Sequence, residues 1–358
     1  MTTVPTSRPF GQLATGETIE CWTLKNEHGA RVEILTYGGI VRSLEVPDRT
    51  GQLADVVLGF DSLAPYLAGH PYFGAITGRI AGRVAGGRLL VQGREYPLVR
   101  NDGKNHLHGG IIGFDKRVWR AEPAGPASLR LTYTSPDGEE GYPGTLDVTV
   151  TYTLTAENAF RVESFATSDR STPLNLAHHS YFNLAGEAHD TIADHQLEIF
   201  ADACVLTDEA FTVSGKRTSL DGHPADFRQP RRLGEAMPGL FQQHGGFYPL
   251  RAPYASPPAT PTLASRVFEP HSGRVLEVRT DDFGIQLYTG SMLDGSLMGK
   301  SGSRYGKHHA LCLECQGHPD GTRWPEFGDI LVHPEKPQRR TTIYAFSTRS
   351  ISSRSVVS

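Results

Sequence analysis

The chain has 358 residues, with 35 Lys and Arg against 39 Asp and Glu and a formal net charge of −4. This balance lacks the positive excess with which proteins bind nucleic acid or acidic membranes through bulk charge. No stretch approaches the ~18 uninterrupted apolar residues of a membrane-spanning helix, and the N-terminal run MTTVPTSRPFGQ lacks the layout of a secretory signal. We therefore expect a cytoplasmic protein with neither a nucleic-acid nor a membrane partner.

Four cysteines are too few for a disulfide scaffold in a chain of this length. Cys21 and Cys204 stand alone, whereas Cys312 and Cys315 form a C-x-x-C pair. A zinc ribbon needs a second such pair, which this sequence lacks. We expect reduced thiols packed in the core, where a free cysteine behaves as a small hydrophobic side chain.

Short segments of alternating apolar and polar residues run along the whole chain, with almost no sustained helical period. In chain order, we expect strands at 32–34, 56–58, 129–133, 145–154, 196–200, 275–278 and 285–289. The best helix candidate, 62–67, is one or two turns long. Short strands separated by turn residues predict an all-β sandwich or barrel.

No change in composition marks a domain boundary, since the 39 Gly and 24 Pro are spread along the whole length. We expect one domain over residues 1–348. The remaining residues, 349–358, are Ser-rich and weakly patterned, which is typical of a frayed terminus.

Histidines cluster in two polar motifs. His106 and His108 flank Leu107 in the run NHLHGG, and residues two apart on a strand point to the same face. We therefore expect both rings to face one site. His178 and His179 stand together in the run NLAHHSYFNLAG. A hydrogen-bonded core or surface role is the alternative for each histidine.

Glu314 lies in an apolar run and should occupy a strand, on the same face as Cys312 and Gln316. Burial raises the pKa of a carboxylate and suits it to general-base catalysis near neutral pH. A structural ion pair with a core arginine is the alternative. From these residues alone, the set is typical of an acid–base or metal site on an all-β scaffold.

Taken together, the motifs resemble those of the galactose mutarotase (aldose 1-epimerase) family. The runs occur in the family's order between residues 36 and 320: TYGGIVRSLEVPD, VVLGFDSLAPYL, GRIAGRV, NHLHGG, GFDKRVW, NLAHHSYFNLAG, DFR, GIQLYTGSMLDG and CLECQGHPD. The resemblance implies a large antiparallel β-sandwich of the galactose-mutarotase-like type (a supersandwich) with very little helix. It also implies a monomer or weak homodimer, and neither a cofactor nor a metal.

The implied reaction is interconversion of the α and β anomers of a free aldose, such as galactose or glucose. A base takes the proton of the anomeric hydroxyl and an acid protonates the ring oxygen, which opens the ring to the aldehyde. By similarity, Glu314 is the base and His179 the acid. The sugar-binding residues fall, by motif, on Arg83, His108, Tyr181 and Gln286.

Three positions depart from the family's pattern. Gly82 and His178 stand where the family commonly has Asn, immediately before the arginine and the catalytic histidine. The family's sugar-binding Asp falls on His244, or on Gln243 if one residue is inserted. We expect these two residues to contact the sugar and to alter sugar preference more than the acid–base step, because a lost hydrogen bond to a buried hydroxyl costs binding.

Three alternative functions remain open at this point. One is a cupin-like metal enzyme, whose three-His, one-carboxylate ligand set would be His106, His108, His179 and Glu314. The second is a sugar sensor of the same fold that has lost turnover. The third is an epimerase of a modified or phosphorylated aldose, with Arg228 or Arg251 meeting the anionic group.

Overall fold

The computed structural model describes residues 3–240, 246–250 and 259–350. Strands dominate these residues, and the long pairs are antiparallel, which confirms the all-β expectation. The described residues include two short α-helices, α1 (Leu63–Ala68) and α2 (Leu233–Leu240). The first is the helix expected at 62–67; the second, which contains Pro238, was not predicted. Neither is long and apolar enough to span a membrane.

The largest sheet has nine strands. Its spatial order is β11 (Arg120–Gly125), β12 (Ser128–Ser135), β13 (Leu146–Leu154), β14 (Ala159–Ser168), β27 (Gln338–Thr348), β23 (Arg274–Thr280), β22 (Thr262–Phe268), β17 (Gln196–Ile199) and β20 (Arg231–Arg232). In β13 every second residue is buried, as its alternating sequence predicts. One face of the sheet is therefore apolar and needs a cover.

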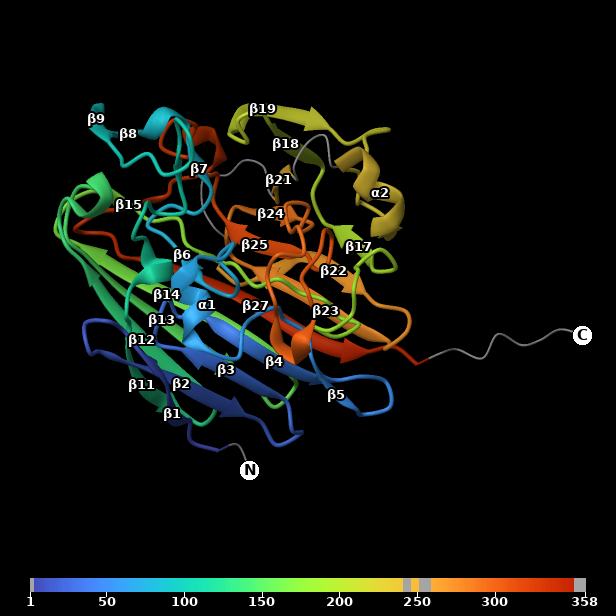
Figure 1. Ribbon diagram of the computed structural model, residues 1–358. Helices are drawn as coiled ribbons and strands as arrows, with labels where there is room; N and C mark the ends of the chain where they lie inside the picture. The colour runs from blue at the N-terminus through green and yellow to red at the C-terminus, as the bar shows by residue number, and fades with distance from the viewer. Residues whose placement is uncertain (1–2, 241–245, 251–258, 351–358) are drawn as a thin grey trace, which may run out of the picture.

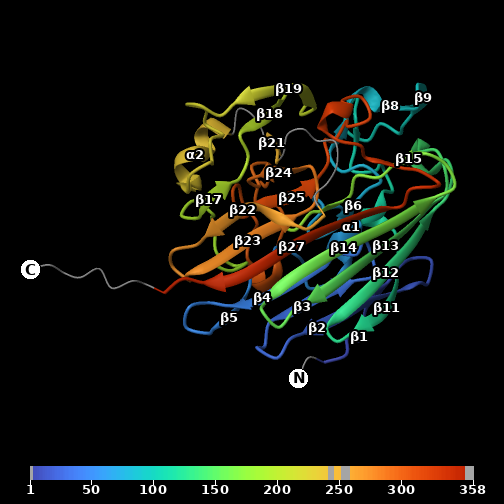
Figure 2. The same ribbon diagram turned by 180° about the vertical axis from the view of Figure 1, so that it is seen from behind.

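Two five-stranded sheets provide that cover, and Figure 2 shows the nine-stranded sheet in front with both of them behind it. One sheet consists of β1 (Thr6–Gln12), β2 (Thr18–Lys25), β3 (Arg31–Leu35), β4 (Val41–Pro47) and β5 (Leu53–Asp55). The other runs β19 (Val213–Ser219), β18 (Ala203–Thr207), β21 (Gly246–Pro249), β24 (Gly284–Tyr288) and β25 (Cys312–Gln316). The three sheets enclose one extended core cluster.

Two tyrosines show how the layers are joined. The Tyr152 hydroxyl donates to the Gly39 carbonyl at 2.9 Å, and the Tyr344 hydroxyl donates to the Leu313 carbonyl at 3.3 Å. Both side chains are fully buried, so each hydroxyl has the partner that a buried polar group requires. The nine-stranded sheet is thereby tied to both of its covering sheets.

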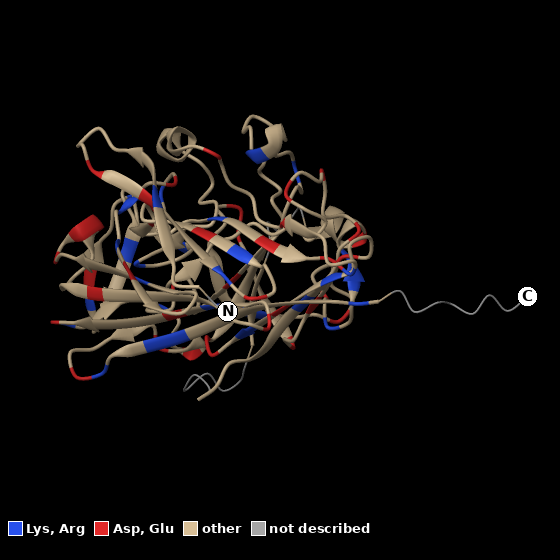
Figure 3. Cartoon of the chain, turned by 90° about the horizontal axis from the view of Figure 1, so that it is seen from below, with Lys and Arg blue, Asp and Glu red and all other residues tan. Residues whose placement is uncertain are grey.

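Four two-stranded ladders complete the fold, and Figure 1 shows β7, β8 and β9 at the top of the molecule. They pair β6 (Ile76–Thr77) with β16 (Ala177–His178), β7 (Arg83–Val84) with β10 (His106–Leu107), β8 (Arg88–Val91) with β9 (Arg94–Pro97), and β15 (Thr172–Pro173) with β26 (Leu331–Val332). The first two carry, or end next to, most of the residues discussed below. Charged residues of both signs are scattered over many strands and loops (Figure 3).

The strand expected at 56–58 was a wrong prediction. Val57 makes only an isolated bridge to Phe182. The Val56 N–H still donates to the Leu44 carbonyl at 2.9 Å, but the N–H groups of Leu44 and Val57 donate to the Asp55 carboxylate at 3.0 and 3.2 Å, which ends the regular β4–β5 pairing. The apolar run 56–58 is buried in the core without belonging to a strand.

Arg79 is a fully buried cation beneath the loop that leads to β7. Its guanidinium donates to Ser135 Oγ, Thr172 Oγ1 and the carbonyls of Ser135, Pro136 and Pro143, at 2.9 to 3.1 Å. Burial lowers its pKa to about 10, so it remains charged at neutral pH. Four of these bonds fasten the β6–β7 segment to the end of β12 and the turn that follows it, and the bond to Thr172 reaches β15.

Replacing this arginine by a residue of similar length tests that role. Arg79→Met leaves the carbonyls of Ser135, Pro136 and Pro143 without this donor, and we expect a loss of about 3 kcal/mol in the free energy of unfolding. Arg120→Met, at a side chain 81% exposed, is the matched control and should lose less than about 0.5 kcal/mol. Urea titration of both variants measures the difference, and equal stabilities would contradict this account of Arg79.

Candidate active site

A pocket with a cavity volume of about 170 Å³ opens against β24 and β25. Gln286 of β24 and Glu314 of β25 face each other across the ladder and both line it. Strand alternation separates their neighbours, because Leu313 and Cys315 point into the core while Glu314 and Gln316 line the pocket. The prediction that Glu314 and Gln316 lie on the same face of their strand is therefore confirmed.

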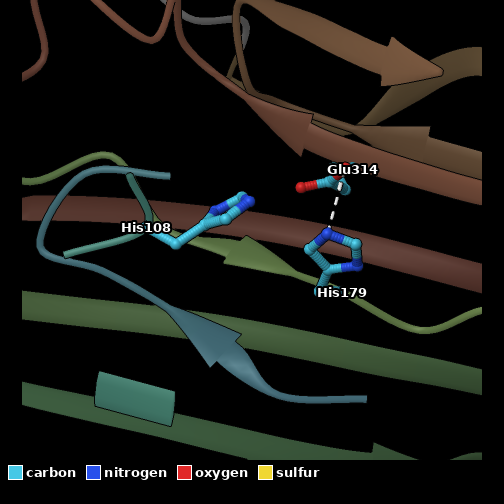
Figure 4. Close-up of side chains that lie close together, drawn as sticks. All are labelled: His108, His179 and Glu314. Atoms are coloured by element: carbon cyan, nitrogen blue, oxygen red, sulfur yellow. Dashed lines mark ion pairs between the residues drawn. The ribbon is translucent and has the colours of Figure 1, made fainter. Parts of the chain in front are cut away.

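Glu314 and His179 form a buried acid–base pair. His179 Nε2 lies 3.6 Å from Glu314 Oε1, and the two residues are 4% and 3% exposed. His179 directly follows β16, whose pairing with β6 fixes the approach of this segment. Figure 4 shows Glu314, His179 and His108 converging from three different elements.

Desolvation sets the protonation of this pair. Burial raises the pKa of Glu314 to about 8, against which the nearby Arg83 guanidinium acts in the opposite direction. Burial lowers the pKa of His179 to about 4. Between these values the pair binds one proton, because it gains a second only below the lower pKa and loses its last above the higher one.

The tautomer of His108 is fixed by the backbone. The Gly82 N–H donates to His108 Nδ1 at 3.1 Å, so Nδ1 is an acceptor. Burial, with the charge of neighbouring His179, holds the pKa of His108 well below its usual value, and the ring is neutral. A neutral imidazole with an accepting Nδ1 carries its hydrogen on Nε2. His108 is thus prepared to donate a hydrogen bond at Nε2.

The expectation that His106 shares this site was wrong. His108 has a left-handed backbone (φ 48°), which breaks the alternation that would place both rings on one face. The His106 ring instead lies in the core, with Nδ1 2.6 Å from the Val99 carbonyl and Nε2 2.6 Å from the Tyr142 hydroxyl. His106 therefore has the hydrogen-bonded core role that the sequence analysis gave as the alternative for each histidine.

Three potential metal ligands nevertheless meet here, since one donor atom each of His108, His179 and Glu314 lie within 4.8 Å of one another. A metal-binding histidine usually donates its second ring N–H to an acceptor. His108 does the opposite, because its Nδ1 accepts from the Gly82 backbone. Binding a metal through Nε2 would then require lone pairs on both ring nitrogens. The donor set therefore fits hydrogen bonding to a substrate better than metal coordination.

The remaining expected binding residues also line the pocket. Arg83 is held by an ion pair with Asp102 at 2.7 Å and lies over the Phe211 ring at 5.1 Å. The Tyr181 ring stacks on the His179 imidazole, with centroids 5.1 Å apart and planes inclined by 16°. Together with His108 and Gln286, these residues surround the acid–base pair.

Two of the three departures from the family's pattern can be located. Gly82 has φ 79°, and a Cβ there would lie 2.7 Å from Pro319, so a side chain at this position would be strained and crowded. The His178 ring points away from the pocket and packs among Tyr152, Phe160 and Tyr344. Its replacement of Asn thus changes the core, not the pocket. Gln243 and His244 lie outside the described residues.

Sequence reasoning missed several pocket residues, namely Tyr72, Phe211, Tyr288, Met292 and Gln316. The sequence could have predicted Gln316 as a pocket residue, because it shares a strand face with Glu314. Its Oε1 atom is buried without a hydrogen-bond partner, and so can accept a bond from a ligand hydroxyl. Tyr72 and Phe211 come from irregular segments with positive φ, for which the sequence has no periodic signal.

One of the two arginines proposed to bind the anionic group of a phosphorylated aldose is already paired. Arg228 donates at 2.8 Å to both Asp221 and Asp226, so its charge is already neutralised by neighbours. Arg251 lies outside the described residues. The four cysteines are unpaired and buried, as expected.

Known proteins are similar to this chain in sequence, and a solved structure is similar to it in fold. Galactose mutarotase of Bos taurus is 42% identical over 342 residues, which cover 94% of this chain and 97% of that protein. Aldose 1-epimerase of Haemophilus influenzae is 33% identical over 310 residues, covering 85% and 88%. The solved structure of the GalM/aldose epimerase homologue from C. elegans is similar with a TM-score of 0.84 and 29% identity, covering 92% of this chain and 98% of that one.

The family comparison agrees with these individual similarities. The family model described as aldose 1-epimerase matches residues 20–345, and thus nearly the whole chain from β2 to β27. The matched range includes the acid–base pair and the pocket around it. The chain belongs to the aldose 1-epimerase family.

Proposed function

We propose that the protein is an aldose 1-epimerase, an isomerase that interconverts the α and β anomers of a free aldohexose such as galactose or glucose. The observation that carries the proposal is the pair of Glu314 and His179, 3.6 Å apart and buried at the wall of a pocket. Mutarotation needs one base and one acid that exchange roles, and this pair supplies both.

Ring opening uses the form of the pair with its proton on His179. Glu314 removes the proton of the anomeric hydroxyl while His179 protonates the ring oxygen, and the C1–O5 bond breaks. The pair then has its proton on Glu314. After rotation about the C1–C2 bond, Glu314 returns the proton to the carbonyl oxygen while His179 takes the hydrogen of the C5 hydroxyl. The ring closes on the other face, and the pair is regenerated.

Arg83 and His108 stabilise charge during this exchange. Burial makes their hydrogen bonds to a sugar oxygen stronger than they would be in water. Because His108 can donate only at Nε2, it suits the developing negative charge on a sugar oxygen. Gln286 and the free Oε1 of Gln316 offer amide contacts for ring hydroxyls.

A free sugar fits the charges of the pocket better than a phosphorylated one. Among the described residues that line it, Arg83 is the one Lys or Arg, and its charge is paired with Asp102. The sugar-sensor alternative is disfavoured by the matched acid and base, which binding alone does not require. The proposal includes a role in hexose metabolism and a cytoplasmic location, which the four free thiols support.

Removing either member of the pair should abolish catalysis. We expect Glu314→Gln and His179→Asn each to lower kcat for mutarotation of freshly dissolved α-D-galactose by about 10²- to 10⁴-fold. Polarimetry measures the rate after the uncatalysed rate is subtracted. His178→Asn is the matched control, since its ring lies in the core, and should retain activity within a few-fold. Near-normal turnover by Glu314→Gln would remove Glu314 from the mechanism.

The rate should also depend on pH in a way set by the shared proton. Below about pH 4 the pair binds a second proton and lacks a base, and above about pH 8 it loses its last proton and lacks an acid. We therefore expect kcat/KM to be highest between these values and to fall about tenfold per pH unit beyond each. An enzymatic rate that keeps rising to pH 10 would be inconsistent with the pair.

A further inference from the structure

Tyr72 stands in the pocket on a backbone that a tyrosine rarely adopts. It lies between α1 and β6 and has φ 62°, in the left-handed region. Two hydrogen bonds hold the turn: the Tyr72 N–H donates to the His70 carbonyl at 2.9 Å, and the Ala75 N–H donates to the Tyr72 carbonyl at 3.0 Å. A bulky residue held in this conformation is typical of a functional position.

The same turn is tied to the backbone of His179. The Gly74 N–H donates to the His179 carbonyl at 3.0 Å, and the His179 N–H donates to the Ala75 carbonyl at 2.9 Å. Directly beyond them, β6 pairs with β16. Main-chain bonds therefore hold the turn that carries Tyr72 against the backbone of His179.

The Tyr72 ring contacts both histidines of the site. Its centroid lies 5.9 Å from that of His179, with planes inclined by 23°, and 4.5 Å from that of His108. His179 also stacks on Tyr181 at 5.1 Å. The acid of the pair thus stacks with two tyrosine rings, of which one comes from a turn that no motif singled out.

We propose that Tyr72 is a positioning residue that holds the imidazoles of His108 and His179 and stabilises the protonated form of His179 through the face of its ring. The inference rests on the proposed function, in which ring opening starts with the proton on His179. An aromatic face within about 6 Å attracts a cation, most strongly where water is excluded. Burial disfavours the imidazolium, and the tyrosine ring offsets part of that penalty.

Other charges bear on the same imidazole. The groups that face it or its partners are Glu314 of β25, His108 after β10, Arg83 of β7, Lys116 of the 3₁₀ turn Phe114–Lys116, and His70 before the Tyr72 turn. An ionised Glu314 favours the imidazolium, whereas the two cations oppose it. Lys116 is itself paired with Asp115 at 2.8 Å and lies 5.5 Å from the Tyr72 ring. Both histidine neighbours are held neutral by burial, which lowers their pKa values.

Two substitutions at Tyr72 distinguish the contribution of its aromatic ring from that of its hydroxyl. Tyr72→Phe keeps the aromatic face, and we expect kcat within about threefold of the unmodified enzyme and an unchanged pH profile. Tyr72→Leu removes the face, so the low-pH limb of kcat/KM should move down by about half to one pH unit, and kcat should fall about three- to tenfold. Tyr96→Leu, on β9 and outside the pocket, is the matched control and should change neither.

A readout independent of activity keeps this inference distinct from the proposed function. Titration of the His179 ring by ¹⁵N NMR in the unmodified protein and in Tyr72→Leu should show a lower pKa in the variant. If the proposed function itself were wrong, the unmodified protein would not catalyse mutarotation. The inference is overturned if Tyr72→Leu leaves the His179 pKa unchanged or raises it, or if Tyr72→Phe is impaired as much as Tyr72→Leu.

Discussion

The exclusion of water from Glu314 and His179 is the constraint on which the site depends. In water a carboxylate loses its proton well below an imidazolium, so the proton of such a pair would rest on histidine. Burial reverses that order, with pKa values of about 8 for Glu314 and about 4 for His179. Near neutral pH the proton of the pair therefore rests on Glu314, and the form with the proton on His179, from which ring opening starts, is the minor one. Neighbouring groups that favour the imidazolium thereby gain influence over the rate.

The strands that bury Glu314 and His179 also contribute side chains to the hydrophobic core. On β25, Leu313 and Cys315 pack against the nine-stranded sheet while Glu314 and Gln316 line the pocket. At the end of β16, His178 packs among aromatic core residues and His179 enters the site. Glu314 and His179 are thus each flanked on their own backbone by residues that pack in the core.

Local alternation made much of this predictable, and long-range contacts account for the rest. The strand at 145–154 and the shared face of Glu314 and Gln316 follow from a period of two residues. The His106 prediction failed because the backbone turns at His108, where one positive φ redirects a ring. The family resemblance supplied the acid–base roles. It gave no indication of Tyr72, whose position depends on bonds to the distant His179 backbone.

The most direct test of the central claim is the protonation state of Glu314 itself. Protein labelled with ¹³C at the glutamate carboxyl can be titrated by NMR, with the spectrum of Glu314→Gln assigning the signal. The account predicts a carboxyl that is protonated at pH 7 in the sugar-free protein and ionises near pH 8. A Glu314 signal already ionised at pH 5 would show that burial does not raise the pKa of this carboxyl, and would contradict the claim that exclusion of water sets the protonation of the pair.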